Sequence, residues 1–172
     1  MTYEPGPSLD AGIALLSGID FWRIPAVPGL GVDEIVMSDG PAGVRGVRWD
    51  ERDTSINVPC PTALSSSWDR TLVRVIGALL AQEARRKGVH VLLAPTINLH
   101  RTPYGGRYFE CFSEDPVLTA EIAAAYIQGV QDGGVAATAK HYVANDTESE
   151  RFTVDVRVDE RVLREVYLLP FE

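Results

Sequence analysis

One pattern occurs three times along this chain and constrains the fold most strongly: an apolar segment typical of a buried strand stops at a polar or Pro/Gly-rich loop. The segments are residues 34–38, 89–93 and 135–139, and they are followed by Asp39-Gly40-Pro41, Ala94-Pro95 and Lys140-His141. Helix-like segments separate them. The resulting βαβαβ order predicts a parallel α/β sheet whose functional groups gather at the carboxyl ends of the strands.

Residues 68–87 form the clearest helical segment. Their apolar side chains recur at helical spacing, the last turn is basic, and Gly88 follows. We expect Ser66 or Ser67 to cap this helix and Trp68 to pack in the core. The expected buried stripe consists of Leu72, Val75, Ile76, Leu79 and Leu80.

The remaining segments predict shorter helices and long loops. A second helix is expected to begin at Pro116 after an Asp115 cap, and to bury Leu118, Ile122, Tyr126 and Val130. Further helices are expected over residues 9–17 and after Asp159. Residues 19–31, 40–61, 95–113 and 143–151 are expected to form loops.

Composition and charge restrict the classes of partner. The chain has 172 residues, 45% of them hydrophobic, and a net charge of -8, which suits a globular domain and argues against nucleic acid or an anionic membrane surface. No apolar run reaches the ~20 residues of a membrane span, and no signal peptide is visible. Cys60 and Cys111 lack metal-ligand spacing. We expect free thiols, a cytoplasmic protein, and no metal or cofactor.

The first candidate site residue is a carboxylate at a strand end. Asp39 either turns the chain before Gly40-Pro41 or faces a ligand, and spacing alone favours neither. Arg45 follows between two glycines. It either reaches back to Asp39 in a structural ion pair or faces the same ligand.

The other candidates are cationic or carry imidazole. Arg107 follows a di-glycine, which either lets it approach a ligand closely or leaves it solvated in a flexible loop. Lys140 and His141 end a buried strand, where a charged group usually faces a cleft or an ion partner. Arg151 lies in an acidic loop that can hold it by ion pairs. Such side chains bind sugar hydroxyls, and nearby aromatic rings could stack on a sugar: Phe21, Trp22, Trp49 and Tyr104.

Several motifs, in order and over nearly the whole chain, resemble the N-terminal domain of glycoside hydrolase family 3, in its β-glucosidase branch. They are Leu15-Leu16-Ser17-Gly18, residues 38–46, residues 93–99, residues 105–116, Lys140-His141-Tyr142, residues 145–151 and residues 163–172. Cys111 departs from the family, which often has serine at this position. Residues 143–151 lack the Gly-His-Gly loop of the N-acetylglucosaminidase branch, so the resemblance favours β-glucosides.

The resemblance implies a (β/α)8 (TIM-type) barrel, of which residues 1–172 are the first, incomplete part. It implies that the nonreducing-end glucose of a β-glucoside is bound by Asp39, Arg45, Arg107, Lys140, His141 and Arg151. The family reaction is retaining hydrolysis, which needs a nucleophile and an acid/base carboxyl about 5–5.5 Å apart.

The family's nucleophile lies in a later Ser-Asp-Trp type motif, which this chain does not contain. We therefore expect truncation before the nucleophile and no activity from the isolated chain. Two alternatives remain: a noncatalytic sugar-binding or pseudoenzyme fragment, and one chain of a split β-glucosidase. Because an open sheet exposes edges, self-association or a partner chain that completes the barrel is also expected.

Overall fold

A four-stranded sheet forms the centre of the protein in the computed structural model, which describes residues 8–48 and 50–172. The spatial order is β1 (Arg23–Ile24), β2 (Ile35–Asp39), β3 (Val91–Leu93) and β4 (Ala136–Ala137). The last three strands are parallel, as the sequence predicts, and the short β1 pairs antiparallel with β2. All three parallel strands therefore present their carboxyl ends at one edge.

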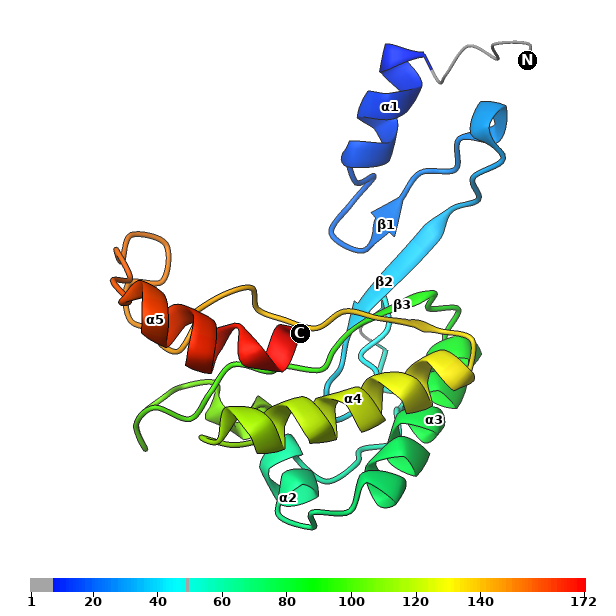
Figure 1. The fold of residues 1–172 in the computed structure, drawn as a ribbon. Coiled ribbons are helices and arrows are strands. Elements are labelled where there is room, and N and C mark those ends of the chain that lie inside the picture. Colours follow the sequence, from blue (N-terminus) through cyan, green and yellow to red (C-terminus); the bar gives the residue numbers. More distant parts are fainter. Residues whose placement is uncertain (1–7, 49) are drawn as a thin grey trace, which may run out of the picture.

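Two long helices connect the parallel strands. The helices α3 (Arg70–Arg86) and α4 (Pro116–Asp132) lie side by side against the sheet (Figure 1). They approach closely because Gly77 and Gly129 face the opposite helix. A Cβ atom at Gly129 would collide with the carbonyl oxygen of Arg74. This close crossing fixes where β3 and β4 begin and, in turn, where their carboxyl ends lie.

The core fills the space between this helix pair and the sheet. Tyr126 of α4 is fully buried, its ring meets that of Phe112 edge-on at 6.3 Å, and its hydroxyl donates to the carbonyl of Pro41. Of the expected buried face of α4, Ile122, Tyr126 and Val130 are buried, and Leu118 is partly buried against the core. The largest side chains buried with Tyr126 and Phe112 include Leu80, Leu92, Ile97, Leu99 and Ile122.

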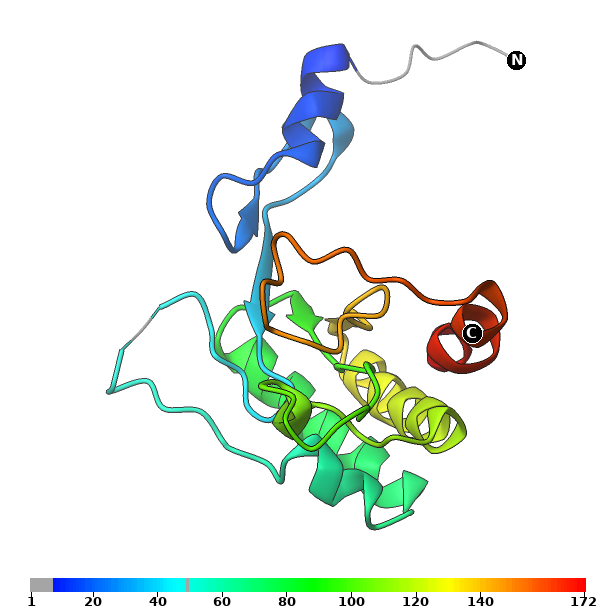
Figure 2. The ribbon, with the colours of Figure 1, turned by 90° about the vertical axis from the view of Figure 1, so that its left-hand side faces the viewer.

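The loop after β2 is held at the far end of α3. Figure 2 shows this connection, residues 40–48 and 50–60, extending outward from the sheet. Arg86 binds Asp53, the carbonyl of Thr54 and the buried Glu83. The loop thus has a defined course although it contains little regular structure.

Short elements complete the described residues. At the N-terminal side, α1 (Leu9–Leu16) and a 3-10 turn (Pro28–Leu30) accompany β1 in an arm that extends away from α3 and α4 (Figure 1). At the C-terminal side, α5 (Glu160–Val162) continues into a π turn (Leu163–Tyr167) and a 3-10 turn (Leu169–Phe171) that packs on α4. None of the helices in residues 8–48 and 50–172 combines the length and apolar character needed to cross a bilayer.

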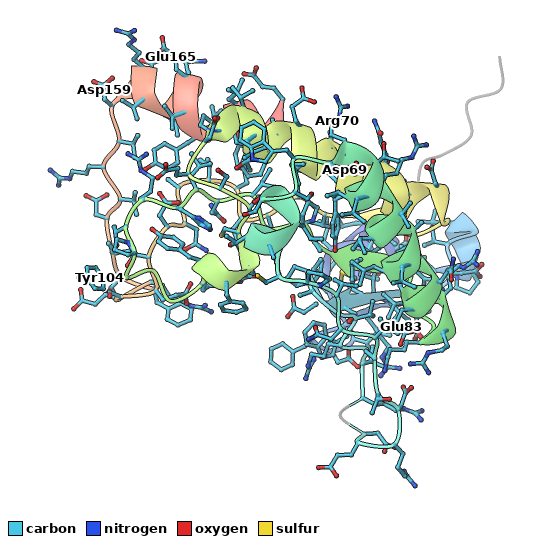
Figure 3. The ribbon with its side chains drawn as sticks, turned by 90° about the horizontal axis from the view of Figure 1, so that it is seen from below. Asp69, Arg70, Glu83, Tyr104, Asp159 and Glu165 are labelled. Carbon is cyan, nitrogen blue, oxygen red and sulfur yellow. The ribbon has the colours of Figure 1, made fainter. Side chains whose placement is uncertain are left out.

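The structure corrects several local predictions. Asp69, and not Ser66 or Ser67, caps α3 by accepting from the amides of Thr71 and Leu72. Figure 3 labels Asp69 and Arg70 at the start of this helix. Trp68 has a positive φ of 55° and is 73% exposed, so it does not pack in the core. Leu72 and Val75 are also exposed.

One of the expected loops, residues 95–113, contains a 3-10 turn (Tyr108–Glu110), and an unpredicted short helix, α2 (Pro61–Ser65), begins at the last residue of the expected loop 40–61. The strand β1 and its neighbouring 3-10 turn lie within residues 19–31, which were expected to be a loop.

Candidate functional site

Two strand ends meet through an ion pair. Asp39 is the last residue of β2, and its Oδ1 lies 3.1 Å from the Nζ of Lys140, which follows β4. The Lys140 side chain is 14% exposed and that of Asp39 is 48% exposed. The ammonium group is thus largely withdrawn from water, whereas the carboxylate remains open to a ligand.

His141 is held by Asn98, which follows β3. The backbone amide of His141 donates to Asn98 Oδ1 at 2.8 Å, and the amide group of Asn98 donates to the carbonyl of His141 at 3.1 Å. The ring atom Nδ1 lies 3.1 Å from the same Oδ1, and Nε2 lies 3.0 Å from Nη2 of Arg107. Because Arg107 can only donate, Nε2 accepts and the ring proton resides on Nδ1.

The charge state of His141 follows from this environment. Burial, followed by the positive charges of Arg107 and Lys140, lowers the pKa of His141 from 6.5 to about 4. The ring is therefore neutral at physiological pH, and it accepts a hydrogen bond from a cation that would repel its protonated form.

Arg107 links the strand ends to the next loop. Besides His141, its guanidinium contacts Glu110 through Nε and Glu148 through Nη1, the latter at 3.5 Å. Glu148 in turn accepts from Arg151 at 2.9 Å. The hydrogen bond from Arg151, with the positive charge of Arg107, lowers the pKa of the Glu148 carboxyl.

These contacts form two groups, Asp39 with Lys140, and His141 with Arg107, Glu148 and Arg151. The groups adjoin because Lys140 and His141 are consecutive, so five of the six candidate residues lie in one charged cluster, and Glu148 links the loop to the strand ends. The charged cluster comprises Asp39, Lys140, His141, Arg107, Glu148 and Arg151.

Arg45, the sixth candidate, is placed against the N-terminal arm. Its guanidinium carbon lies 4.6 Å from the centre of the Trp22 ring, and its backbone amide donates to the carbonyl of Asp39 at 2.9 Å. Phe21 is 92% exposed. Tyr104 is equally exposed and lies at the periphery in Figure 3. Trp49 lies outside the described residues.

Sequence reasoning missed three buried residues that hold the charged cluster in place by hydrogen bonds. Thr96, Asn98 and Glu110 are all buried and all bind cluster residues or one another. The separation of three between Arg107 and Glu110 was a usable signal, since it matches one helical turn. The pairing of Asn98 with His141 had no local signal because 43 residues separate them.

The cluster offers both positively and negatively charged groups that can form hydrogen bonds. In the part of the chain that the structure describes, no three His, Cys, Asp or Glu side chains converge as metal ligands. Cys111 lies beneath the cluster, and burial, together with the charge of Glu110, raises the pKa of its thiol to about 12. The chemistry available here is charge-assisted recognition of a polar ligand.

These charged side chains lie at the carboxyl edge of a parallel sheet backed by helices, which is where α/β proteins commonly place their small-molecule sites. The sequence model of the family described as "Glycosyl hydrolase family 3 N terminal domain" matches residues 35–172. The chain therefore belongs to glycosyl hydrolase family 3, and its fold is the first part of that family's (β/α)8 barrel. The resemblance carried by the sequence motifs is confirmed.

Curated and solved relatives agree with this membership. "Probable beta-glucosidase J" of Aspergillus fumigatus is 54% identical over 96% of this chain, and "Probable beta-glucosidase I" of Neosartorya fischeri is 49% identical over 96%. The chain spans about a fifth of the length of these relatives, 19% and 20% respectively.

Two solved structures share the fold. The β-glucosidase of Kluyveromyces marxianus in complex with glucose superimposes with a TM-score of 0.92 at 44% identity, covering 96% of this chain and 20% of that one. β-Glucosidase 3B of Thermotoga neapolitana in complex with α-D-glucose gives a TM-score of 0.81 at 44% identity, covering 87% and 21%.

Proposed function

We propose that this chain supplies the glucose-binding part of a retaining β-glucosidase, which hydrolyses terminal nonreducing β-D-glucosyl residues. The observation that carries the proposal is the meeting of Asp39, Lys140 and His141 with Arg107 at one edge of the sheet. The similarity to β-glucosidases, including one in complex with glucose, supports glucose as the sugar.

The geometry suits a ring that carries several hydroxyl groups. Lys140 occupies one oxygen of Asp39, and the half-exposed carboxylate retains lone pairs that can accept from sugar hydroxyls. The ammonium group has further N–H groups to donate. Charge-assisted hydrogen bonds of both kinds discriminate one hydroxyl pattern from another. Arg45 and Arg151 remain proposed contacts.

The test uses the natural polypeptide that carries this sequence. Asp39→Asn is compared with Asp33→Asn, an exposed acid outside the cluster, for glucose affinity and for hydrolysis of an aryl β-D-glucoside. We expect Asp39→Asn to weaken glucose binding about tenfold to a hundredfold, because a charge-assisted hydrogen bond is lost. The control should behave like the wild type. Equal glucose affinity in both variants would overturn the proposal.

We further propose that the isolated chain does not catalyse hydrolysis. Three carboxylates at or beside the cluster are held by cations: Asp39 by Lys140, Glu110 by Arg107, and Glu148 by Arg151 and Arg107. Asp146 lines the same pocket, without an ion pair among the described residues, and would supply at most one of the two carboxyls. A retaining mechanism requires a nucleophile and a proton donor that are free to react. Hydrolysis of an aryl β-glucoside by the purified 172-residue chain, above that of Asp39→Ala, would contradict this.

A second reading is a noncatalytic sugar-binding fragment or one chain of a split β-glucosidase. The described sheet favours a partner, because β4 pairs only with β3 among the described strands and its other edge is open. We propose that self-association or a second chain covers this edge. Sedimentation of the purified chain tests it, and a monomer at micromolar concentration would count against it.

We propose the cytoplasm as the compartment of this protein. The free thiols of Cys60 and Cys111 support this proposal.

A further inference from the structure

Glu110 is a buried carboxylate with both oxygens engaged. The residue is 5% exposed and ends the 3-10 turn that begins directly after Arg107. Its Oε1 accepts from Nε of Arg107, and its Oε2 accepts from the hydroxyl of Thr96 at 2.9 Å. Thr96 is 1% exposed, and its backbone forms isolated parallel β-bridges with both Cys111 and Lys140. Glu110 therefore connects the guanidinium to the centre of the fold.

The three nitrogens of Arg107 contact three different partners. Nε faces Glu110, Nη2 faces His141 at 3.0 Å, and Nη1 faces Glu148 at 3.5 Å. A guanidinium group is planar, so holding Nε on one side fixes the direction of both Nη atoms. Glu148 is 30% exposed at its side chain and lies in a loop, whereas the Glu110 side chain is 7% exposed. Of the two carboxylates, Glu110 is the rigid one.

We propose that Glu110 is a positioning residue of the sugar site, which acts through Arg107 by fixing the plane of its guanidinium group. The inference rests on the proposed function, because it concerns how Arg107 is presented to glucose. Glu110 is not a proton donor or nucleophile, since Arg107 and Thr96 occupy both of its oxygens and its side chain is only 7% exposed.

A double-mutant cycle on glucose affinity tests the inference in the natural polypeptide. Glu110→Gln keeps the shape of the side chain and removes its charge. We expect this change to weaken glucose binding about tenfold, because the guanidinium loses a charge-assisted anchor. In an Arg107→Lys background, which has no planar group to orient, the same change should cost less than about twofold. Glu114→Gln, an exposed carboxylate four residues along, is the matched control and should have no effect in either background.

The outcomes separate the two proposals. If the wild type does not bind glucose, the proposed function fails and this inference fails with it. If the wild type binds glucose and Glu110→Gln binds it equally well, only the positioning role is overturned. A loss of the same size with and without Arg107 would show a general structural role for Glu110 and would also overturn the inference.

A second variant and a spectroscopic readout cover the case in which Glu110→Gln does not fold. Thr96→Val removes only the hydroxyl that holds Glu110, and it should weaken glucose binding in the same direction by a smaller factor. In the wild type, the Nε proton of Arg107 should give a slowly exchanging NMR signal, because it is donated to a buried carboxylate. An unchanged signal in Thr96→Val together with unchanged glucose affinity would contradict the proposal.

Discussion

The Nζ of Lys140 lies 3.1 Å from Oδ1 of Asp39, although 101 residues separate the two in sequence. Asp39 ends β2 and Lys140 follows β4, and β3 lies between these two strands in the sheet, so the ion pair spans the width of three strands. Lys140 is the more buried partner. The burial of its ammonium group makes the pair more than a surface contact, because an unpaired charge at this depth is costly.

A double-mutant cycle on stability should detect this pair. Asp39→Asn and Lys140→Met each remove one partner, and their coupling in the free energy of unfolding should be about 1–2 kcal/mol, given that Asp39 is half-exposed. Urea unfolding of the four proteins measures it. Arg157 and Asp155 form an ion pair with both side chains more than three-quarters exposed and serve as the control cycle, with coupling near zero. Equal couplings in the two cycles would contradict the inferred role of burial.

The depressed pKa of His141 makes stability depend on pH. Its folded-state pKa of about 4 lies below its usual 6.5, so between these values the unfolded state binds a proton that the folded state does not. The free energy of unfolding should therefore decrease as the pH falls from 6.5 towards 4, and this contribution should level off below 4. His141→Asn should remove it. NMR titration of the His141 ring provides the direct check, and a midpoint near 6.5 in the folded protein would refute the assignment.

The sequence predicted the parts of the fold that depend on local patterns. The parallel order of β2, β3 and β4, the Asp115 cap and most of the buried face of α4 follow from short-range signals and are confirmed. Asp69 was missed as the cap of α3 because Ser66 and Ser67 carry the same signal a few residues earlier. The choice depends on Trp68, whose backbone has a positive φ, and periodicity contains no information about that.

The sequence predicted which residues belong to the candidate site, but not the contacts between them. Asp39, Lys140 and His141 stand at strand ends, so their convergence follows from the topology. Glu148 links Arg107 to Arg151, and this depends on the course of an irregular loop. Arg45 shows the same limit, because the interaction of its side chain with Trp22 depends on the N-terminal arm. Contacts between loops have no periodic signature, so only coordinates reveal them.

The two thiols should differ in reactivity. Cys60 is exposed, whereas Cys111 is buried and its pKa is raised to about 12. Because the thiolate is the nucleophile, native protein treated with iodoacetamide at pH 8 should be alkylated at Cys60 only. Both cysteines should react after unfolding in urea, as measured by the mass of tryptic peptides. Rapid labelling of Cys111 in the native state would show that the base of the charged cluster is open to solvent.

The crossing of α3 and α4 should be highly sensitive to one methyl group. Gly129→Ala would place a Cβ against the carbonyl of Arg74, which is helix backbone and cannot turn aside. We expect the free energy of unfolding to fall by about 3 kcal/mol, the upper end of the usual range for overpacking. The helices must separate to accept the methyl group, and because they set the positions of β3 and β4, the contact between Lys140 and Asp39 should lengthen as well.

Gly12→Ala is the matched control for that change. Gly12 lies inside α1, and a Cβ there meets nothing within 4 Å. Alanine is favoured over glycine in a helix interior by about 1 kcal/mol, so this variant should be as stable as the wild type or slightly more stable. Thermal unfolding and glucose titration of both variants distinguish the close crossing from a general effect of replacing glycine. If Gly129→Ala unfolds at the same temperature as Gly12→Ala, the two helices do not approach as closely as the structure indicates.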